Sequence, residues 1–80
     1  MNNENVARRS FNRVLTDREA EVLGYVMKGW TNHQIARQMS ITPHTVKAHI
    51  ASVLRKTGTK NRLEAAMFCY QRGLVSPHLN

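Results

Sequence analysis

Four helix-start signals recur along this chain, each directly before a run of apolar residues at helical spacing. The signals begin at Thr16, Thr31, Thr42 and Asn61. After three of them Glu or Gln follows three positions later, which is the spacing of a capping box, and after Thr42 a proline occupies the first helical position. Eighty residues provide one small core. We therefore expect an all-α, compact four-helix domain.

The apolar positions predict which face of each helix is buried. The first stripe is Leu23, Val26, Met27 and Trp30, with Gly29 as terminator; the second is Ile35, Ala36 and Met39; the third is Val46, Ile50, Val53 and Leu54. A short helix, a three-residue link and a longer helix form the outline of a helix-turn-helix. We place this unit at about residues 30–49, within a domain spanning residues 15–75. A flexible N-terminal segment, residues 1–14, precedes the domain, and a tail, residues 76–80, follows it.

The charge distribution points to a polyanionic partner. The net charge is +7, and no carboxylate occurs from Val22 to Leu63, although basic residues continue throughout. Double-stranded DNA is the favoured partner, and an anionic membrane surface is the second candidate. No run approaches the roughly 18 apolar residues of a membrane span. Cys69 is the single cysteine and lies in an apolar run, which predicts an inert core thiol in a cytoplasmic, nucleoid-associated protein.

The third helix, about residues 43–57, has an outer face with short side chains and no acids. With Val46 as origin and about 100° per residue, Ile50 and Val53 share its side. The opposite side carries His44, Ala48, Ala51 and Arg55, with Lys47 and Ser52 on its flanks and Thr45 and His49 at the boundary. A major groove about 12 Å wide admits a helix only where the facing side chains are short. We predict base contacts by Lys47, Ala48 and Ala51.

Phosphate contacts favour amides at helix N-termini and small polar or basic side chains. The candidates are Thr31, Asn32, Thr42, His44, Thr45, His49, Arg55, Lys56 and Lys60. Each also has a simpler interpretation. The alanines are good helix formers, Lys47 and Arg55 can be solvated charges, and His49 can be a packing residue. For Thr31 and Thr42 we favour capping of their own helices.

Metal binding and catalysis find little support in the residues. His44 and His49 are about 140° apart around a helix, and a lone cysteine adds no ligand pair. The acids are accounted for as first-turn and capping groups, and no nucleophile has a base and an orienting group. We expect no metal, no cofactor and no enzymatic activity.

Motifs run in one register through residues 15–66: L-T-x-R-E-x-E-V-L, T-N-x-x-I-A, T-V-K-x-H and the N-R before the last helix. On these motifs the chain closely resembles the LuxR-type helix-turn-helix DNA-binding domain of bacterial transcription regulators. The resemblance implies four helices, a recognition helix in the major groove, and base contacts at the positions of Lys47, Ala48 and Ala51. It also implies dimerisation through the last helix, about residues 62–72, where we expect contacts from Leu63, Met67 and Tyr70. Thr57 and Thr59 depart from the family, which usually has Leu and an aliphatic residue there.

The sequence therefore predicts a bacterial transcription regulator that binds double-stranded DNA sequence-specifically, as a dimer on an inverted repeat. The alternative is a protein-interaction module whose apolar last helix docks on RNA polymerase or another regulator, with DNA binding weak or absent. Family members commonly carry an N-terminal receiver or ligand-binding domain, for which this chain has no room. A stand-alone regulator and the DNA-binding end of a longer one are both open.

Overall fold

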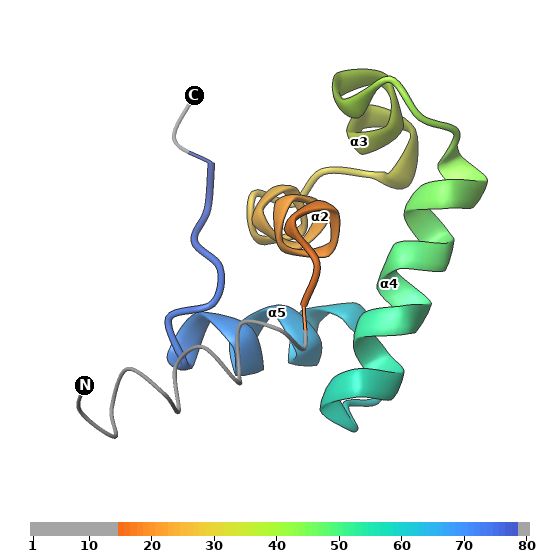
Figure 1. Ribbon diagram of the computed structural model, residues 1–80. Helices are drawn as coiled ribbons and strands as arrows, with labels where there is room; N and C mark the ends of the chain where they lie inside the picture. The colour runs from red at the N-terminus through yellow and green to blue at the C-terminus, as the bar shows by residue number, and fades with distance from the viewer. Residues whose placement is uncertain (1–14, 79–80) are drawn as a thin grey trace, which may run out of the picture.

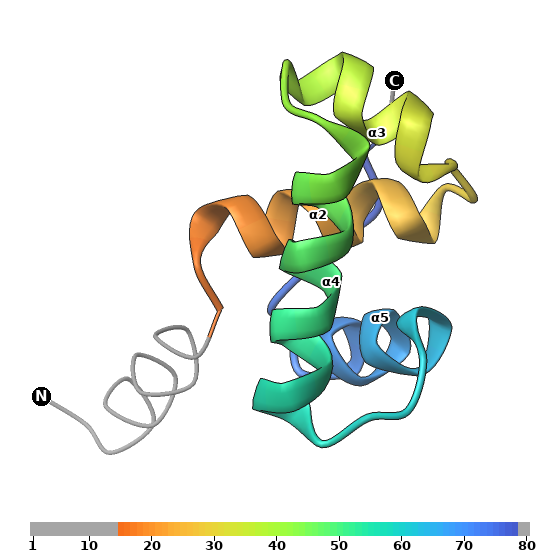
Figure 2. The same cartoon turned by 90° about the vertical axis from the view of Figure 1, so that its right-hand side faces the viewer.

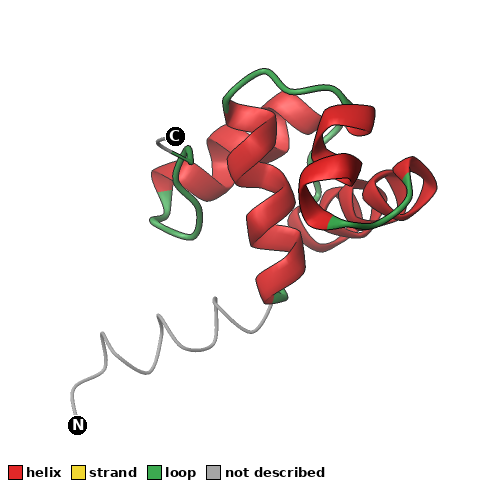
Figure 3. Ribbon diagram, turned by 90° about the horizontal axis from the view of Figure 1, so that it is seen from above, coloured by secondary structure: helices red, strands yellow, loops and turns green. Residues whose placement is uncertain are grey.

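The computed structural model describes residues 15–78, which form an all-α bundle (Figure 1). Its helices are α2 (Asp17–Met27), α3 (Asn32–Met39), α4 (Pro43–Thr57) and α5 (Arg62–Gln71). The predicted four-helix class is confirmed for this part of the chain, in which Figure 3 shows helices and loops alone. The longest helix has 15 residues, and none of the described helices is long and apolar enough to cross a bilayer. The predicted N-terminal segment, 1–14, lies outside the described residues.

The helices begin at the predicted caps. At α2 the Thr16 hydroxyl accepts from the Glu19 amide at 3.1 Å, and the Glu19 carboxylate accepts from the Thr16 amide at 2.9 Å. Helix α3 starts with the same reciprocal pair of bonds. At α5 the Asn61 side chain accepts from the Glu64 amide at 2.9 Å. Because each cap satisfies otherwise unpaired amides of a first turn, these local bonds determine where the helices start.

One predicted helical position lies outside its helix. Helix α2 ends at Met27, before Trp30, and Gly29 takes the left-handed conformation with φ 82°. The chain therefore reverses, and the Trp30 ring stacks on Tyr25 with 4.6 Å between ring centroids. The apolar stripe predicts Trp30 as a further helical position of α2. In the structure Trp30 packs against the core from the turn that follows α2.

The turn between α3 and α4 is made without a glycine. Ser40 takes the left-handed conformation, with φ 57° and ψ 43°, at the end of α3. This conformation costs a serine roughly 1 kcal/mol relative to glycine. The Ile41 amide then donates to the Ala36 carbonyl at 3.0 Å, and the Ile41 side chain packs against the core. A closing hydrogen bond and an apolar anchor thus hold the turn of the helix-turn-helix.

Helix α2 lies at the centre of the bundle, in contact with both α4 and α5, and α3 packs on α4 (Figures 1 and 2). All four helices and both flanking segments contribute to the core. Its members are Leu15, Val22, Leu23, Tyr25, Val26, Ile35, Ala36, Met39, Val46, Ile50, Val53, Ala65, Ala66, Cys69 and Val75. This one core fixes α4 with one face inward and the other in solvent.

Residues 74–78, which we call the C-terminal strap, fold back beside α2 (Figure 1). The His78 ring lies 4.0 Å from the Tyr25 ring, centroid to centroid, and its Nε2 lies 3.1 Å from the Glu21 carbonyl oxygen. A Cβ on Gly24 would lie 2.6 Å from that Nε2, so only glycine admits the ring at this distance. The packed chain therefore continues to His78, three residues past the predicted domain end at residue 75.

Candidate nucleic-acid interface

Helix α4 presents to solvent the face that its helical spacing predicted. The inner side chains Val46, Ile50 and Val53 are at most 7% exposed. On the outer side His44, Lys47, Ala48 and Arg55 are exposed, and Thr45, His49, Ala51 and Ser52 are partly buried. The three residues predicted to contact bases thus share one accessible stretch of the helix. Because two of them are alanines, a ligand can approach the α4 backbone closely there.

Carboxylates are confined to other helices. Helices α3 and α4 contain none, and the carboxylates of the described residues are Asp17, Glu19 and Glu21 on α2 and Glu64 on α5. Glu19 is buried, with 4% exposure. The helix-turn-helix surface therefore has basic side chains and no negative charge of its own, which favours a polyanion.

The N-termini of α3 and α4 carry satisfied caps. Thr31 Oγ1 accepts from the Gln34 amide at 3.2 Å. Thr42 Oγ1 accepts from the Thr45 amide at 3.1 Å and lies 3.0 Å from the Thr45 hydroxyl. The favoured interpretation of Thr31 and Thr42 as caps is therefore confirmed by these bonds. The earliest amides of a helix have no acceptor within the helix, so both ends retain the geometry that binds anions.

Arg62 is a structural residue whose role the sequence reasoning missed. Its Nη2 donates to the Trp30 carbonyl at 2.9 Å, and its Nη1 donates to the Asn32 carboxamide oxygen. Arg62 thereby connects the start of α5 to the turn before α3 and holds the Asn32 side chain. The signal was an arginine in the first turn of a helix, where the dipole disfavours a cation unless something else holds it.

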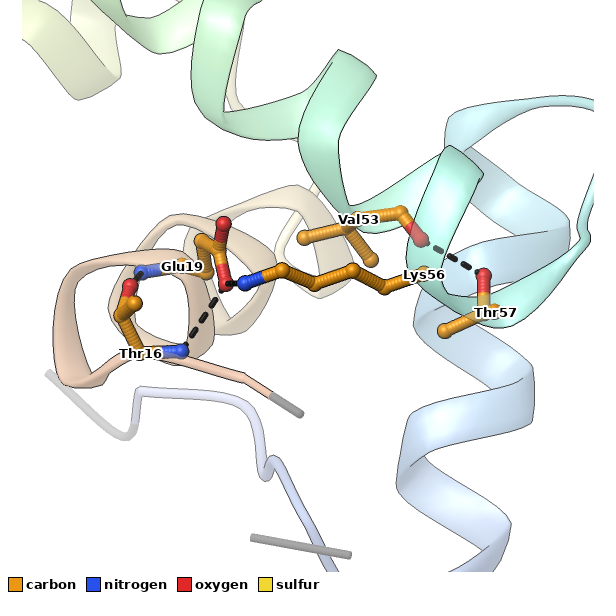
Figure 4. A network of polar contacts seen from close by, with 5 residues as sticks. All are labelled: Thr16, Glu19, Val53, Lys56 and Thr57. Atoms are coloured by element: carbon orange, nitrogen blue, oxygen red, sulfur yellow. Dashed lines mark hydrogen bonds and ion pairs between the residues drawn. The ribbon is translucent and has the colours of Figure 1, made fainter. Parts of the chain in front are cut away.

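Helix α4 is held against α2 by a buried carboxylate (Figure 4). Lys56 Nζ lies 2.8 Å from Glu19 Oε1, and the Glu19 side chain is 5% exposed. Burial acts to raise the pKa of Glu19, but hydrogen bonds from Lys56, the Thr16 amide and Ser52, with the Lys56 charge, outweigh it. The pKa of Glu19 consequently lies below its usual value.

This carboxylate pairs with Lys56, near the C-terminal end of α4. The pair connects α4 to the first turn of α2. Lys56 thus has a structural role that its prediction as a phosphate contact did not include. The network positions the helix whose outer side carries Ala48.

The two threonines that depart from the family pattern close the end of α4 with hydrogen bonds. Thr57 Oγ1 donates to the Val53 carbonyl at 2.8 Å and lies 2.8 Å from the Thr59 hydroxyl (Figure 4). Between them Gly58 ends α4 in the left-handed conformation, with φ 69°. The hydroxyl pair holds this loop. Lys60, a predicted phosphate contact, is exposed in the same loop.

Helix α5 has an exposed apolar row on its outer side. Leu63, Met67 and Tyr70 are 63%, 52% and 54% exposed. The inner side is buried, and Cys69 on it has no exposed surface. Burial raises the pKa of the Cys69 thiol, with a smaller opposing effect of Arg72, and the thiol lies in the core as predicted. The exposed row is available for a contact between two chains.

The fold, together with the exposed, acid-free outer face of α4, defines a helix-turn-helix DNA-binding domain of a transcription regulator. The family model described as bacterial regulatory proteins, luxR family, matches residues 13–69, and the chain belongs to this family. The resemblance inferred from the motifs is thereby confirmed.

Relatives and a solved structure agree with this assignment. The response regulator protein VraR of Staphylococcus aureus is 35% identical over 75 residues, which cover 94% of this chain and 36% of the relative. VraR of Staphylococcus epidermidis matches to the same extent. The chain thus spans about a third of the length of these relatives, at 36%. The structure of the transcription factor GerE superposes with a TM-score of 0.76 at 28% identity, covering 79% of this chain and 94% of GerE.

Proposed function

We propose that this domain binds double-stranded DNA sequence-specifically by inserting α4 into the major groove. The observation that carries the proposal is the outer face of α4. This face is accessible, it has short side chains at its centre and no acids, and the opposite face is buried. A groove about 12 Å wide accepts such a face. A helix that faces only solvent does not require short side chains or the absence of acids. A regulator with this function works on the nucleoid in the bacterial cytoplasm.

The side chains divide into two roles. Lys47 reads a guanine edge through O6 and N7, and the methyl groups of Ala48 and Ala51 contact thymine methyls. Phosphates are contacted by the flanking side chains and the helix N-termini: Thr31, Asn32, Thr42, His44, Thr45, His49, Arg55 and Lys60. We leave Lys56 out of this set because its ammonium group already pairs with Glu19.

We propose that two chains dimerise through the α5 row, Leu63, Met67 and Tyr70. An apolar row that is more than half exposed on a helix favours burial against an equivalent surface. A two-fold dimer puts two copies of α4 on an inverted repeat, with half-sites one or more helical turns of DNA apart.

Salt tests the DNA proposal against the alternative of a protein-interaction module. With about five of the eight proposed groups as simultaneous phosphate contacts, the logarithm of the affinity falls with a slope of about −4.5 against the logarithm of the salt concentration. A fourfold rise in salt should therefore weaken binding to selected duplex DNA about 500-fold, as measured by fluorescence anisotropy. Docking through the apolar α5 row would give a flat dependence, and that result would favour the interaction module.

Met67→Asp tests the dimer. The side chain is 52% exposed, so the variant should keep its helical content by circular dichroism. Burying the new carboxylate in an apolar interface should raise the dimer dissociation constant at least about tenfold, measured by sedimentation. Gln38→Asp, an exposed position on α3 with the same charge change, is the matched control and should sediment like the parent chain. Equal sedimentation of all three chains would rule out the α5 row as the interface.

A further inference from the structure

A groove lies between α2, the end of α5 and the C-terminal strap. Its volume is about 730 Å³. A second hollow of about 300 Å³ adjoins it, shares Asp17, Ala20 and Leu74 with it, and extends to Leu15 and Thr16. We call the two adjoining hollows the α2 groove. It begins at the residue where the described chain begins.

The lining of the α2 groove mixes acidic and apolar side chains. Asp17 and Glu21, one helical turn apart, line it from α2, and Glu21 also lies 3.5 Å from Arg18 Nη1. Ala20, Leu74 and the ring of Tyr70, which is 54% exposed, supply apolar surface. In a chain with a net charge of +7 this site brings together two of the four carboxylates that the described residues contain. Its chemistry suits a segment that alternates basic and apolar side chains.

The α2 groove is separate from the proposed DNA interface. In Figures 1 and 2 the C-terminal strap and α4 lie on opposite sides of α2. A ligand in the groove would therefore leave the outer face of α4 accessible. No residue of the α4 outer face lines the groove.

We propose that residues 8–14 of this same chain bind in the α2 groove. This stretch carries three arginines and two apolar side chains in the order Arg8, Arg9, Phe11, Arg13 and Val14. The arginines pair with Asp17 and compete with Arg18 for Glu21. Phe11 lies against the apolar surface of Ala20 and Leu74. This pairing matches both the charge and the apolar character of the groove.

The tether favours this occupant over a separate molecule. Residue 14 is bonded to Leu15, which itself lines the groove. An extended chain rises about 3.3 Å per residue, so the six residues that precede Leu15, back to Arg9, reach about 20 Å. This length is enough to follow the groove along α2. A short tether gives an effective concentration of about a millimolar or more, so a modest contact suffices for occupancy. A second copy or a foreign basic peptide would have to bind without that advantage.

A spin label on the full chain tests the proposal. Ser10→Cys introduces a reactive thiol, while Cys69 is fully buried and escapes labelling. In isotope-labelled protein without DNA we expect the label to remove most of the amide signal at Ala20, Glu21 and Leu74. Amides on the outer face of α4 should keep theirs. The losses should shrink in 1 M salt, where the Debye length is about 3 Å.

Three further samples decide the outcome. Combining Arg8→Glu, Arg9→Glu and Arg13→Glu with the label should restore the groove signals. Arg37→Glu, an exposed charge reversal on α3, should leave the losses unchanged. In a mixture of spin-labelled chains without isotope and isotope-labelled chains without spin label, the groove signals should persist. Signal loss in that mixture would assign the groove to a second copy, and full groove signals in the first sample would remove the proposal.

Discussion

Ala48→Glu is expected to weaken binding to selected duplex DNA by at least about a hundredfold, or about 3 kcal/mol. Ala48 is exposed in the middle of the acid-free face of α4. A glutamate there is too long for close approach to the bases, and its charge would be desolvated among phosphates with no cation of its own to pair with. The helix itself should be unaffected, because glutamate has good helix propensity and the position faces solvent.

The matched control for this substitution is Ser76→Glu. It makes the same change in net charge at an exposed position of the C-terminal strap, on the side of α2 away from α4. We expect its DNA affinity to fall only by the long-range effect of one charge, about threefold or less at physiological salt. Anisotropy titrations and circular dichroism of both variants complete the test. An Ala48→Glu variant that binds like Ser76→Glu would exclude this face from the interface.

Lys56→Met is expected to lower the free energy of unfolding by about 2 kcal/mol at neutral pH. The substitution leaves the Glu19 carboxylate, which is 5% exposed, without its cation. Losing one partner of a fully buried pair costs about 3–5 kcal/mol. We expect less here because Lys56 is 33% exposed and the Thr16 amide still donates to the carboxylate. Urea unfolding followed by circular dichroism measures the difference.

Arg55→Met is the matched control, since it removes the same charge from the neighbouring position of α4. Arg55 is exposed, so the change in unfolding free energy should stay within about 0.5 kcal/mol. In the salt dependence of DNA binding the order should be reversed, with the larger effect for Arg55→Met. Removing a phosphate contact at Arg55 should reduce the salt slope by about 1, and Lys56→Met should leave the slope unchanged. A reduced slope for Lys56→Met, with unaltered stability, would return Lys56 to the phosphate contacts.

Acid should diminish the effect of Lys56→Met. The pKa of Glu19 is lower in the folded chain than its usual value of 4.5, so its ionised form stabilises the fold above that pH. This stabilisation is lost as the pH falls through the folded pKa. Without Lys56, burial dominates and the pKa of Glu19 rises, so the variant has less stability to lose. The difference in unfolding free energy should therefore shrink between pH 7 and about pH 3. An equal difference at both pH values would contradict the role of the ion pair.

The acid-free outer face of α4 illustrates what could be predicted of the candidate site. Its base-contact candidates, Lys47, Ala48 and Ala51, followed from helical periodicity, and the structure leaves all three at least partly accessible. Lys56 lies on the same helix, and periodicity gave no indication of its partner. That partner is 37 residues away, on a helix whose distance and orientation depend on the packed core.

The sequence by itself determined the helices and the inner and outer faces of each. Caps such as Thr16 with Glu19 join residues three positions apart, and the burial of Val46, Ile50 and Val53 follows from one helical period. Such features depend on neighbours a few positions away, so the order of residues alone encodes them.

The tertiary structure alone decided how the helices are fastened to one another. It paired Glu19 with Lys56 and Arg62 with the Trp30 carbonyl, and it seated His78 against Gly24. Each of these contacts joins residues at least 30 positions apart, and each requires the crossing angles that the shared core imposes. The reason is physical: a local pattern fixes the direction of a side chain on its own helix, and the group it meets there is set by packing.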